Sequence, residues 1–210
     1  MFKGFKNILI YIFFPSIFTL LFTTNINSKE YIICMFLSYI LLTFYFIFIY
    51  KKELISYLKN FKKEHIKTII IYEIIGFILM MLSNYIINYI IIPNGISNNE
   101  LGNRELLYNY KLIYPIILCI LIPFLEEITF RLEFKKNIKN NKLFIFTSSI
   151  TFGLLHILST TKYIELLYII PYTILGLTFS LIYNKTNNIF SNIIAHTIHN
   201  TIIVLILLFL

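Results

Sequence analysis

Charged residues are scarce in this 210-residue chain. Only 13% of the residues are charged and 58% are hydrophobic, whereas a soluble domain carries about 25% charged residues. All 10 acidic residues are Glu, and we read the absence of Asp as a compositional bias without functional meaning. The mean hydropathy of +0.79 excludes water as the main solvent of the folded chain. The composition therefore predicts an integral membrane protein with no separate soluble domain.

Cysteine is also scarce, because the chain has only Cys34 and Cys119. Both lie inside apolar runs, where a thiol usually behaves as a small hydrophobic group. The sequence therefore predicts no disulfide framework.

Long apolar runs occupy most of the chain. A transmembrane helix needs about 20 mostly apolar residues, and seven runs reach or approach that length. They cover residues 7–24, 31–50, 68–92, 113–132, 143–160, 163–184 and 189–210. We predict an all-α integral membrane fold with about seven transmembrane helices, a multi-pass protein of the cell membrane. The first run is expected to remain as an anchor, because no small-residue cleavage site follows it.

Basic residues are unevenly distributed between the two sides of the predicted bundle. With a cytoplasmic N-terminus, 14 of the 18 basic residues fall on the cytoplasmic side. The opposite side keeps Lys29, Arg104, Lys111 and Lys162. This asymmetry follows the positive-inside rule and predicts a cytoplasmic N-terminus. Topology thus accounts for the net charge of +8, and no nucleic-acid partner is expected.

The chain is predicted to form a single membrane domain, residues 1–210, in two parts. Residues 1–112 would hold the first three spans and an outer loop, and residues 113–210 the helices that carry polar motifs. Leu54, Leu58 and Phe61 recur at helical spacing among lysines, which is the pattern of an interfacial helix between the second and third spans. The simpler interpretation, a connector that lies along the membrane surface, is favoured. The outer loop, 93–112, is rich in turn-forming residues, so we expect a surface segment of turns.

Ionisable side chains are rare inside the spans and gather in three motifs. A charge at the centre of a membrane helix costs about 2.5–3.5 kcal/mol on insertion scales, so such groups are functional candidates. In the fourth span, Glu127 and Arg131 can pair on one helix face. Glu126 lies about 100° round the helix from Glu127, so Arg131 compensates its charge less directly. Glu126 is therefore the better candidate for a general base. A structural role for both glutamates, paired with basic residues at the helix end, stays open.

The other two motifs place histidines on the fifth and seventh spans. His156 follows Phe152 by one turn, so the aromatic ring can help to orient the imidazole. His196 and Asn200 share one face of the seventh span and could donate hydrogen bonds to a developing oxyanion. The structural alternatives are simple packing of a lone histidine and interhelical hydrogen bonds worth about 0.6 kcal/mol each.

Two further polar residues lie within the spans. His199 could form a metal-ligand pair with His196, although Asn200 lies nearer to a full turn from His196. Glu73 lies near the start of the third span. We expect Glu73 to be structural and either to reach the cytoplasmic surface or to meet Lys67.

Taken together, the three motifs resemble those of a known family. Glu-Glu-x-x-x-Arg at 126–131, Phe-x-x-x-His at 152–156 and His-x-x-x-Asn at 196–200 occur in this order on separate spans. This arrangement is similar to the signature of the CPBP family, the CAAX protease and bacteriocin-processing enzymes, also called the Abi family. The resemblance covers residues 123–200, and every signature residue is present.

The resemblance implies an intramembrane endopeptidase, similar to the type II CAAX prenyl endopeptidases that remove the last three residues of prenylated proteins. By motif, Glu126 and His156 would activate a water molecule, while His196 and Asn200 would stabilise the oxyanion. The supporting residues, structural or substrate-positioning, would be Glu127, Arg131 and Phe152.

Metal use is left open, because the family is described both as metalloproteases and as metal-independent glutamate-type proteases. Glu126, His156 and His196 could bind a divalent metal such as zinc, and the same groups can act without one. For Glu126 to meet His156 at mid-depth, the fourth helix should continue beyond Arg131 at least to Phe134, with its lysines snorkelling and the fifth helix tilted.

The expected partners are the lipid bilayer and a peptide-precursor or membrane-protein substrate. A competing interpretation is a bacteriocin-immunity or binding protein of the same fold without catalysis, but such a protein should have lost at least one motif residue. Catalysis that serves immunity is compatible with the enzyme. A transporter with Glu126 and His156 as a proton relay is a third interpretation, which paired broken helices would favour; the sequence does not show them.

Overall fold

The computed structural model describes residues 6–25, 28–160 and 162–209, and its regular structure is helical, with no strand in these ranges. The helices follow the seven apolar runs, so the predicted all-α fold is confirmed. In chain order they are α1 (Lys6–Phe22), α2 (Lys29–Lys59), α3 (Lys63–Tyr85), η2 (Ile86–Ile91), α4 (Asn98–Asn109), α5 (Tyr114–Ile116), η3 (Ile117–Leu121), α6 (Ile122–Glu127), η4 (Ile128–Glu133), α7 (Phe134–Asn137), α8 (Asn141–His156), η5 (Tyr163–Tyr168), α9 (Ile169–Thr186) and α10 (Ile189–Phe209).

The helices have the length and the surface of membrane-spanning segments. Among the described residues, 4 helices can cross a bilayer by length and composition: Lys29–Lys59, Lys63–Ile91, Tyr163–Thr186 and Ile189–Phe209. Large apolar side chains lie on their outer faces; Phe48, for example, is 82% exposed. A soluble protein rarely exposes so much contiguous apolar surface. The chain is therefore a multi-pass membrane protein, and the count of seven spans with a cytoplasmic N-terminus stays a prediction.

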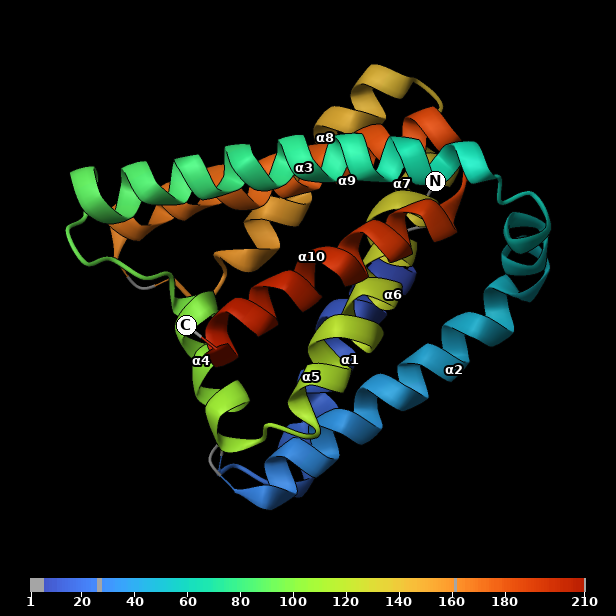
Figure 1. The fold of residues 1–210 in the computed structure, drawn as a ribbon. Helices are drawn as coiled ribbons and strands as arrows, with labels where there is room; N and C mark the ends of the chain where they lie inside the picture. The colour runs from blue at the N-terminus through green and yellow to red at the C-terminus, as the bar shows by residue number, and fades with distance from the viewer. Residues whose placement is uncertain (1–5, 26–27, 161, 210) are drawn as a thin grey trace.

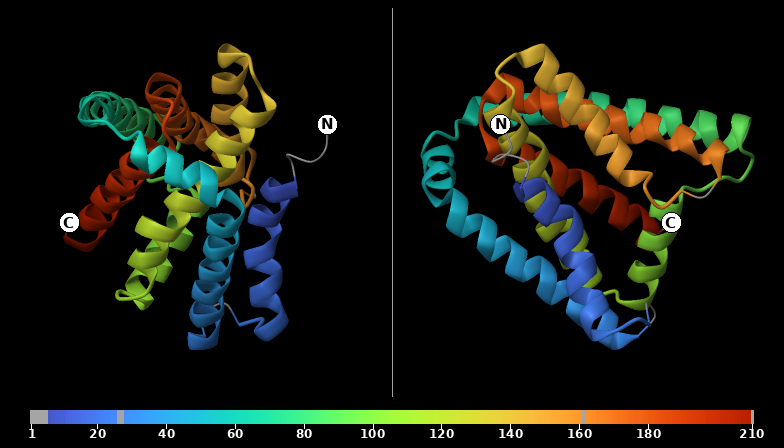
Figure 2. Two further views of the ribbon diagram at one scale, coloured as in Figure 1. Left: turned by 90° about the vertical axis from the view of Figure 1, so that its right-hand side faces the viewer. Right: turned by 180° about the vertical axis from the view of Figure 1, so that it is seen from behind.

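Two groups of helices meet on α10 (Figure 1). One group is formed by α3, α9 and α8, with α9 in contact with both of the others. The other group is formed by the pair α1 and α2 and by the long helix that starts at α5. The views in Figure 2 show the same grouping from the side and from behind. Because α10 packs against α3, α9 and α6, polar residues on its different faces reach both groups.

Glycines let α9 approach its neighbours closely. A Cβ on Gly176 would lie 2.7 Å from the Ser149 carbonyl oxygen on α8, and one on Gly76 would lie 2.2 Å from the Thr178 Oγ1. Small residues at helix contacts are typical of membrane bundles, because van der Waals packing replaces the hydrophobic effect there. These contacts fix α9 and α8 against each other beside the polar motifs.

The fourth span is one long helix that contains two π-helical segments. It runs from Tyr114 to Asn137 through α5, η3, α6, η4 and α7. The prediction that it continues past Arg131 to Phe134 is confirmed. The predicted fifth helix is α8, and it ends at His156, before the end of the apolar run 143–160.

Two expectations about connecting segments are wrong. Residues 54–59 continue α2, in which Leu54 is buried, so they form no separate interfacial helix. The outer loop 93–112 contains helix α4 in place of a run of turns. The Ser97 side chain caps this helix by accepting a hydrogen bond from the Glu100 amide, and Ser is a favoured residue at that position.

Candidate active site

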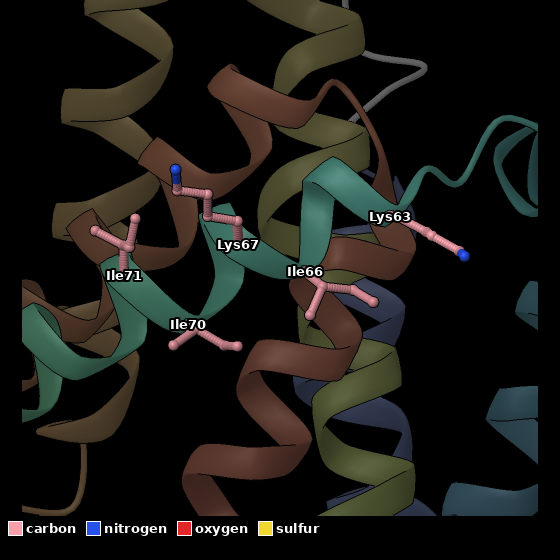
Figure 3. Close-up of a pocket in the computed structure, with 5 residues that line it drawn as sticks. All are labelled: Lys63, Ile66, Lys67, Ile70 and Ile71. Carbon is pink, nitrogen blue, oxygen red and sulfur yellow. The ribbon is translucent and has the colours of Figure 1, made fainter.

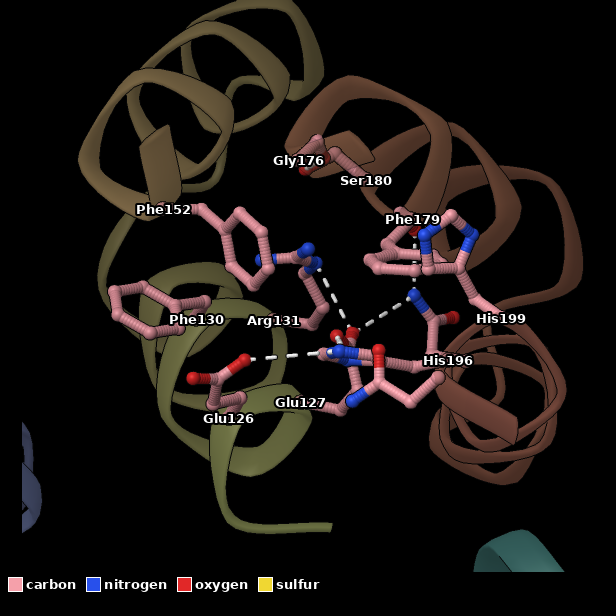
Figure 4. Close-up of polar contacts among 12 residues, drawn as sticks. Glu126, Glu127, Phe130, Arg131, Phe152, Gly176, Phe179, Ser180, His196 and His199 are labelled. Atoms are coloured by element: carbon pink, nitrogen blue, oxygen red, sulfur yellow. Dashed lines mark hydrogen bonds and ion pairs between the residues drawn. The ribbon is translucent and has the colours of Figure 1, made fainter. Parts of the chain in front are cut away.

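Glu127 is the most highly connected carboxylate of the site. It is fully buried on α6, and its Oε2 lies 3.1 Å from the Arg131 Nε. The same oxygen accepts a hydrogen bond of 3.2 Å from the Asn192 Nδ2, and Oε1 lies 2.9 Å from the His196 Nδ1. Figure 4 shows these contacts converging from the fourth span and α10. Because both oxygens are engaged, Glu127 is suited to hold its neighbours in place.

Arg131 supplies the charge that Glu127 needs. Its guanidinium is fully buried, with Cζ 4.9 Å from the centre of the Phe152 ring and 5.6 Å from that of Phe179. Nη1 also donates to the Ser148 hydroxyl at 3.3 Å. The i, i+4 pairing expected from the sequence is therefore present, and aromatic faces stabilise the cation where water cannot.

Glu126 differs from Glu127 because one of its oxygens has no hydrogen-bond partner. Oε1 accepts a hydrogen bond of 2.7 Å from the Tyr11 hydroxyl on α1. Oε2 is buried and has no such partner among the described residues, and it lies 3.7 Å from the His196 Nε2. A carboxylate oxygen with a free lone pair beside an imidazole is equipped to accept a proton.

His196 lies between the two glutamates (Figure 4). Its Nδ1 faces Glu127 at 2.9 Å and its Nε2 faces Glu126 at 3.7 Å. The ring stacks on Phe179, with centroids 4.5 Å apart and an interplanar angle of 23°. These contacts fix both the plane and the direction of the imidazole.

His156 is the last residue of α8 and is held from three sides. Its Nδ1 donates to the Phe152 carbonyl at 2.8 Å, because a carbonyl oxygen can only accept. Its Nε2 then carries a lone pair and has no hydrogen-bond partner among the described residues. The ring packs between Phe152 and Tyr172, with centroid distances of 4.5 Å and 4.6 Å. The Tyr172 hydroxyl contacts the Ser97 hydroxyl at 2.9 Å and the Asn99 Nδ2 at 3.1 Å.

Three of the predicted site residues therefore gather in one place. Glu126, His156 and His196 come from α6, α8 and α10, and the Phe152 ring lies beside both imidazoles, with its centroid 4.5 Å from that of His156 and 5.8 Å from that of His196. Each presents an oxygen or ring nitrogen that has no hydrogen-bond partner among the described residues. The arrangement can bind a small polar molecule such as water and can take up its proton.

Asn200, the fourth predicted residue, connects α10 to the π-helical segment η3. Its Nδ2 donates to the Leu118 carbonyl at 2.8 Å. Ile122 bonds to the Ile117 carbonyl in the π register. The next residue, Pro123, has no N–H, so the Leu118 carbonyl lacks its helical donor and Asn200 supplies one. One N–H of this carboxamide is thus used structurally, and its part in an oxyanion site stays a prediction.

The expectation that Glu73 reaches the surface or meets Lys67 is wrong. Glu73 is buried on α3, and its Oε1 lies 2.7 Å from the Nδ1 of His199 on α10. His199 therefore faces Glu73, while His196 faces the glutamates of α6. The pair connects two membrane helices through a buried polar contact.

The fit to a metal was tested on the donors of the site. Glu126 and His196 offer two donors 3.7 Å apart. Within the described ranges, no group of three or more His, Cys, Asp or Glu side chains is arranged to hold a metal ion.

A hollow of about 520 Å³ lies away from these residues, at the start of α3 (Figure 3). It is open and mostly apolar, and its lining residues are Lys63, Ile66, Lys67, Ile70 and Ile71. None of the motif residues lines it, so the hollow does not belong to the candidate site.

Sequence reasoning missed several residues that shape the site. Asn192 precedes His196 by four residues, so the helical spacing that linked His196 to Asn200 could have found it. Tyr11 could not have been found, because nothing distinguishes it among the 16 tyrosines of the chain. The same holds for Phe179 and Tyr172, which act only through tertiary packing.

Comparison with known proteins supports the resemblance inferred from the motifs. Residues 108–202 match the family model described as "Type II CAAX prenyl endopeptidase Rce1-like". The matched region includes all three motifs and starts after the first three spans. The resemblance to type II CAAX prenyl endopeptidases is thereby confirmed for this region.

Two curated bacterial proteins are similar over a longer part of the chain. One is the "Putative membrane peptidase YdiL" of Bacillus subtilis, which is 29% identical over an alignment of 157 residues; the alignment covers 70% of this chain and 60% of the relative. The other is the "UPF0177 protein YxdF" of Lactococcus lactis, 28% identical over 149 residues, 68% of this chain and 80% of the relative. The chain thus covers less than two thirds of YdiL. No solved structure matches it significantly.

Proposed function

We propose that this membrane protein is an intramembrane endopeptidase that hydrolyses peptide bonds with a water molecule activated by Glu126 and His156. The observation that carries the proposal is the Oε2 of Glu126, which is buried, lies 3.7 Å from the His196 Nε2 and has no hydrogen-bond partner in the part of the chain that the structure describes. A buried carboxylate in this state is costly to maintain for structure alone. The similarity to membrane peptidases supports the same reaction class.

The chemistry follows from the free atoms of the site. In the proposed reaction, water binds between the Glu126 Oε2 and the free Nε2 of His156, and Glu126 takes its proton as the oxygen attacks the peptide carbonyl. The carbon–oxygen bond forms while the carbonyl π electrons move onto oxygen. The carbon–nitrogen bond then breaks, and the proton passes from Glu126 to the leaving amine, so the carboxylate is regenerated.

His196 and Asn200 are assigned to the developing oxyanion. In this role the Nε2 of His196 carries the donated proton, and Glu127 fixes the direction of the ring through Nδ1 at 2.9 Å. Asn200 has a second N–H beyond the one bonded to Leu118. Donors fixed in advance in a low-dielectric site stabilise developing charge more than mobile ones do.

Glu127, Arg131 and Phe152 support this arrangement. The Glu127–Arg131 pair fixes the ring of His196 and balances charge at the centre of the bundle. Phe152 contacts the guanidinium of Arg131 and the imidazole of His156.

The substrate class is proposed from the location of the site. The motif residues lie on apolar helices, so a segment of a membrane protein, or a peptide precursor that enters the bilayer, can reach them. Cleavage of prenylated CAAX proteins is the activity in the name of the matched family, and it is one specific form of this proposal.

The experiment is cleavage of a fluorogenic peptide panel by the purified, detergent-solubilised protein. We compare wild type, Glu126→Ala and His156→Ala, with and without a strong chelator, and use His65→Ala as the control because His65 lies at the start of α3. Both site variants are expected to lose at least about a thousandfold in kcat/KM, as when catalytic groups are removed elsewhere, while His65→Ala keeps wild-type activity.

The outcomes separate the competing interpretations. Loss of wild-type activity in the presence of the chelator would show that the reaction needs a metal ion. Retained activity would show that the side chains catalyse the reaction without one. Equal cleavage by wild type and both site variants would contradict the proposal. If a cellular immunity phenotype also survived both substitutions, a binding protein without catalysis would be the better description.

A further inference from the structure

Tyr11, which lies outside the three motifs, touches the proposed general base. Its hydroxyl donates to the Glu126 Oε1 at 2.7 Å, and its side chain is only 7% exposed. The ring packs edge-on against Phe130, with centroids 6.1 Å apart and an interplanar angle of 86°. Tyr11 belongs to α1, which precedes the region that matches the peptidase family.

A second polar network fixes the position of α1 one turn before Tyr11. The Asn7 Nδ2 donates to the Tyr50 hydroxyl at 2.7 Å and to the Glu133 Oε1 at 3.0 Å. The Tyr45 hydroxyl donates to the Asn7 Oδ1 at 3.3 Å. Residues 7 and 11 share one helix face, so this network sets the rotation of α1 that brings Tyr11 to Glu126.

The contact makes the two oxygens of Glu126 unequal. Oε1 accepts a hydrogen bond from the Tyr11 hydroxyl, whereas Oε2 faces the His196 Nε2 at 3.7 Å and has no hydrogen-bond partner within the described ranges. A carboxylate without such an anchor can rotate about its last bond, and both oxygens then compete for the same donors. A charge-assisted hydrogen bond of this kind is short and strong enough to hold one rotamer.

We propose that Tyr11 is a positioning residue of the active site, which holds Glu126 through Oε1 so that Oε2 is presented to the attacking water. The inference rests on the proposed endopeptidase function. It places part of the site on α1 and makes activity depend on the docking of α1 against α2 and η4. Tyr11 acts through Glu126 and itself touches no reacting atom.

The test is the steady-state kinetics of Tyr11→Phe, which removes one oxygen atom and keeps the ring. The expected result is a kcat about 10- to 100-fold lower with KM almost unchanged, because the lost contact matters for the chemical step and not for substrate binding. Tyr183→Phe is the matched control. Its hydroxyl pairs with that of Tyr57 at 2.9 Å, and Tyr183 is buried to a similar degree, at 2% exposed.

A second variant and a second measurement make the test independent of folding. Asn7→Ala loosens α1 without touching Glu126 and should lower kcat in the same manner, but less. In addition, Tyr11→Phe should lower the melting temperature in detergent less in a Glu126→Gln background than in wild type, because the charge-assisted contact is then already lost.

Each outcome bears on a different claim. If wild type cleaves substrate and Tyr11→Phe cleaves it with an unchanged kcat, the positioning role is wrong and the endopeptidase remains. A rise in KM alone would also overturn it, since that would mean a role in substrate binding. If wild type cleaves nothing, the endopeptidase proposal fails, and this inference fails with it, even where the melting temperatures are coupled.

Discussion

At the scale of single residues, burial determines how much an i, i+4 ion pair contributes to the stability of the protein. Glu127 and Arg131 are both fully buried and lie 3.1 Å apart, whereas the Glu100 and Arg104 side chains are 30% and 46% exposed. An exposed pair contributes about 0–1 kcal/mol. Removal of one partner from a buried pair leaves a charge that water cannot solvate, at a cost of about 3–5 kcal/mol.

We therefore predict that Arg131→Met lowers the free energy of unfolding by about 3–5 kcal/mol. Arg104→Met, the matched control, should lower it by no more than about 1 kcal/mol. The free energy can be measured by titration of the micelle-bound protein with a denaturing detergent. Equal effects of the two substitutions would show that the buried pair is solvated in the membrane.

The sequence predicted residue pairings where both partners lie on one helix. Glu127 and Arg131 meet as their spacing requires, and His156 packs against Phe152 one turn earlier. It did not predict contacts between residues far apart in the chain. Glu73 and His199 are separated by 126 positions, and only the packing of α3 on α10 brings them together.

At the scale of the helix, hydrophobic runs located the elements but not their internal geometry. Apolar length predicted the long helices because the bilayer requires it. The π-helical segments η3 and η4 had no signal in hydropathy. Their position depends on Pro123, which removes one backbone donor, and on the Asn200 and Ser148 side chains, which bond to the Leu118 and Phe130 carbonyls.

The contact between α8 and α9 gives a prediction at this scale. In Gly176→Ala, the new Cβ would lie 2.7 Å from the Ser149 carbonyl oxygen, so the helices must separate. We expect a loss of about 1–3 kcal/mol in unfolding free energy, as for overpacked cores. Activity should fall as well, because α8 carries His156 and α9 carries the Phe179 ring that supports His196.

Gly102→Ala on α4 is the control for that substitution. A Cβ at Gly102 meets no atom within 4 Å. Because alanine favours the helix over glycine, this variant should gain about 0.5–1 kcal/mol. Similar losses in both variants, measured by the same detergent titration, would contradict the close packing of α8 on α9.

At the scale of the whole molecule, the distribution of charge predicts how the bundle sits in the bilayer. The cytoplasmic side is expected to hold 14 of the 18 basic residues, and Lys136 there pairs with Glu53 at 2.8 Å. The positive-inside rule is a statistical tendency over all loops, because the free-energy cost of each charge depends on its depth in the membrane. Which helices pack together could not be predicted, since hydropathy is alike for all of them.

The orientation predicts a labelling pattern in intact cells. In a variant without Cys34 and Cys119, a membrane-impermeant maleimide should label Leu112→Cys from outside, because this position is 87% exposed in the outer loop. It should label Lys139→Cys, on the predicted cytoplasmic side, only after the membrane is opened. Labelling of Lys139→Cys in intact cells would show that the protein has the opposite orientation in the membrane.

The central claim, that Glu126 is the base of an intramembrane endopeptidase, is tested most directly by the cleavage rate of Glu126→Gln. This substitution keeps the size of the side chain and an oxygen that can accept the Tyr11 hydroxyl, but it removes the proton acceptor. We predict a kcat at least about a thousandfold below that of wild type for any peptide that wild type cleaves. A rate within tenfold of wild type would contradict the account.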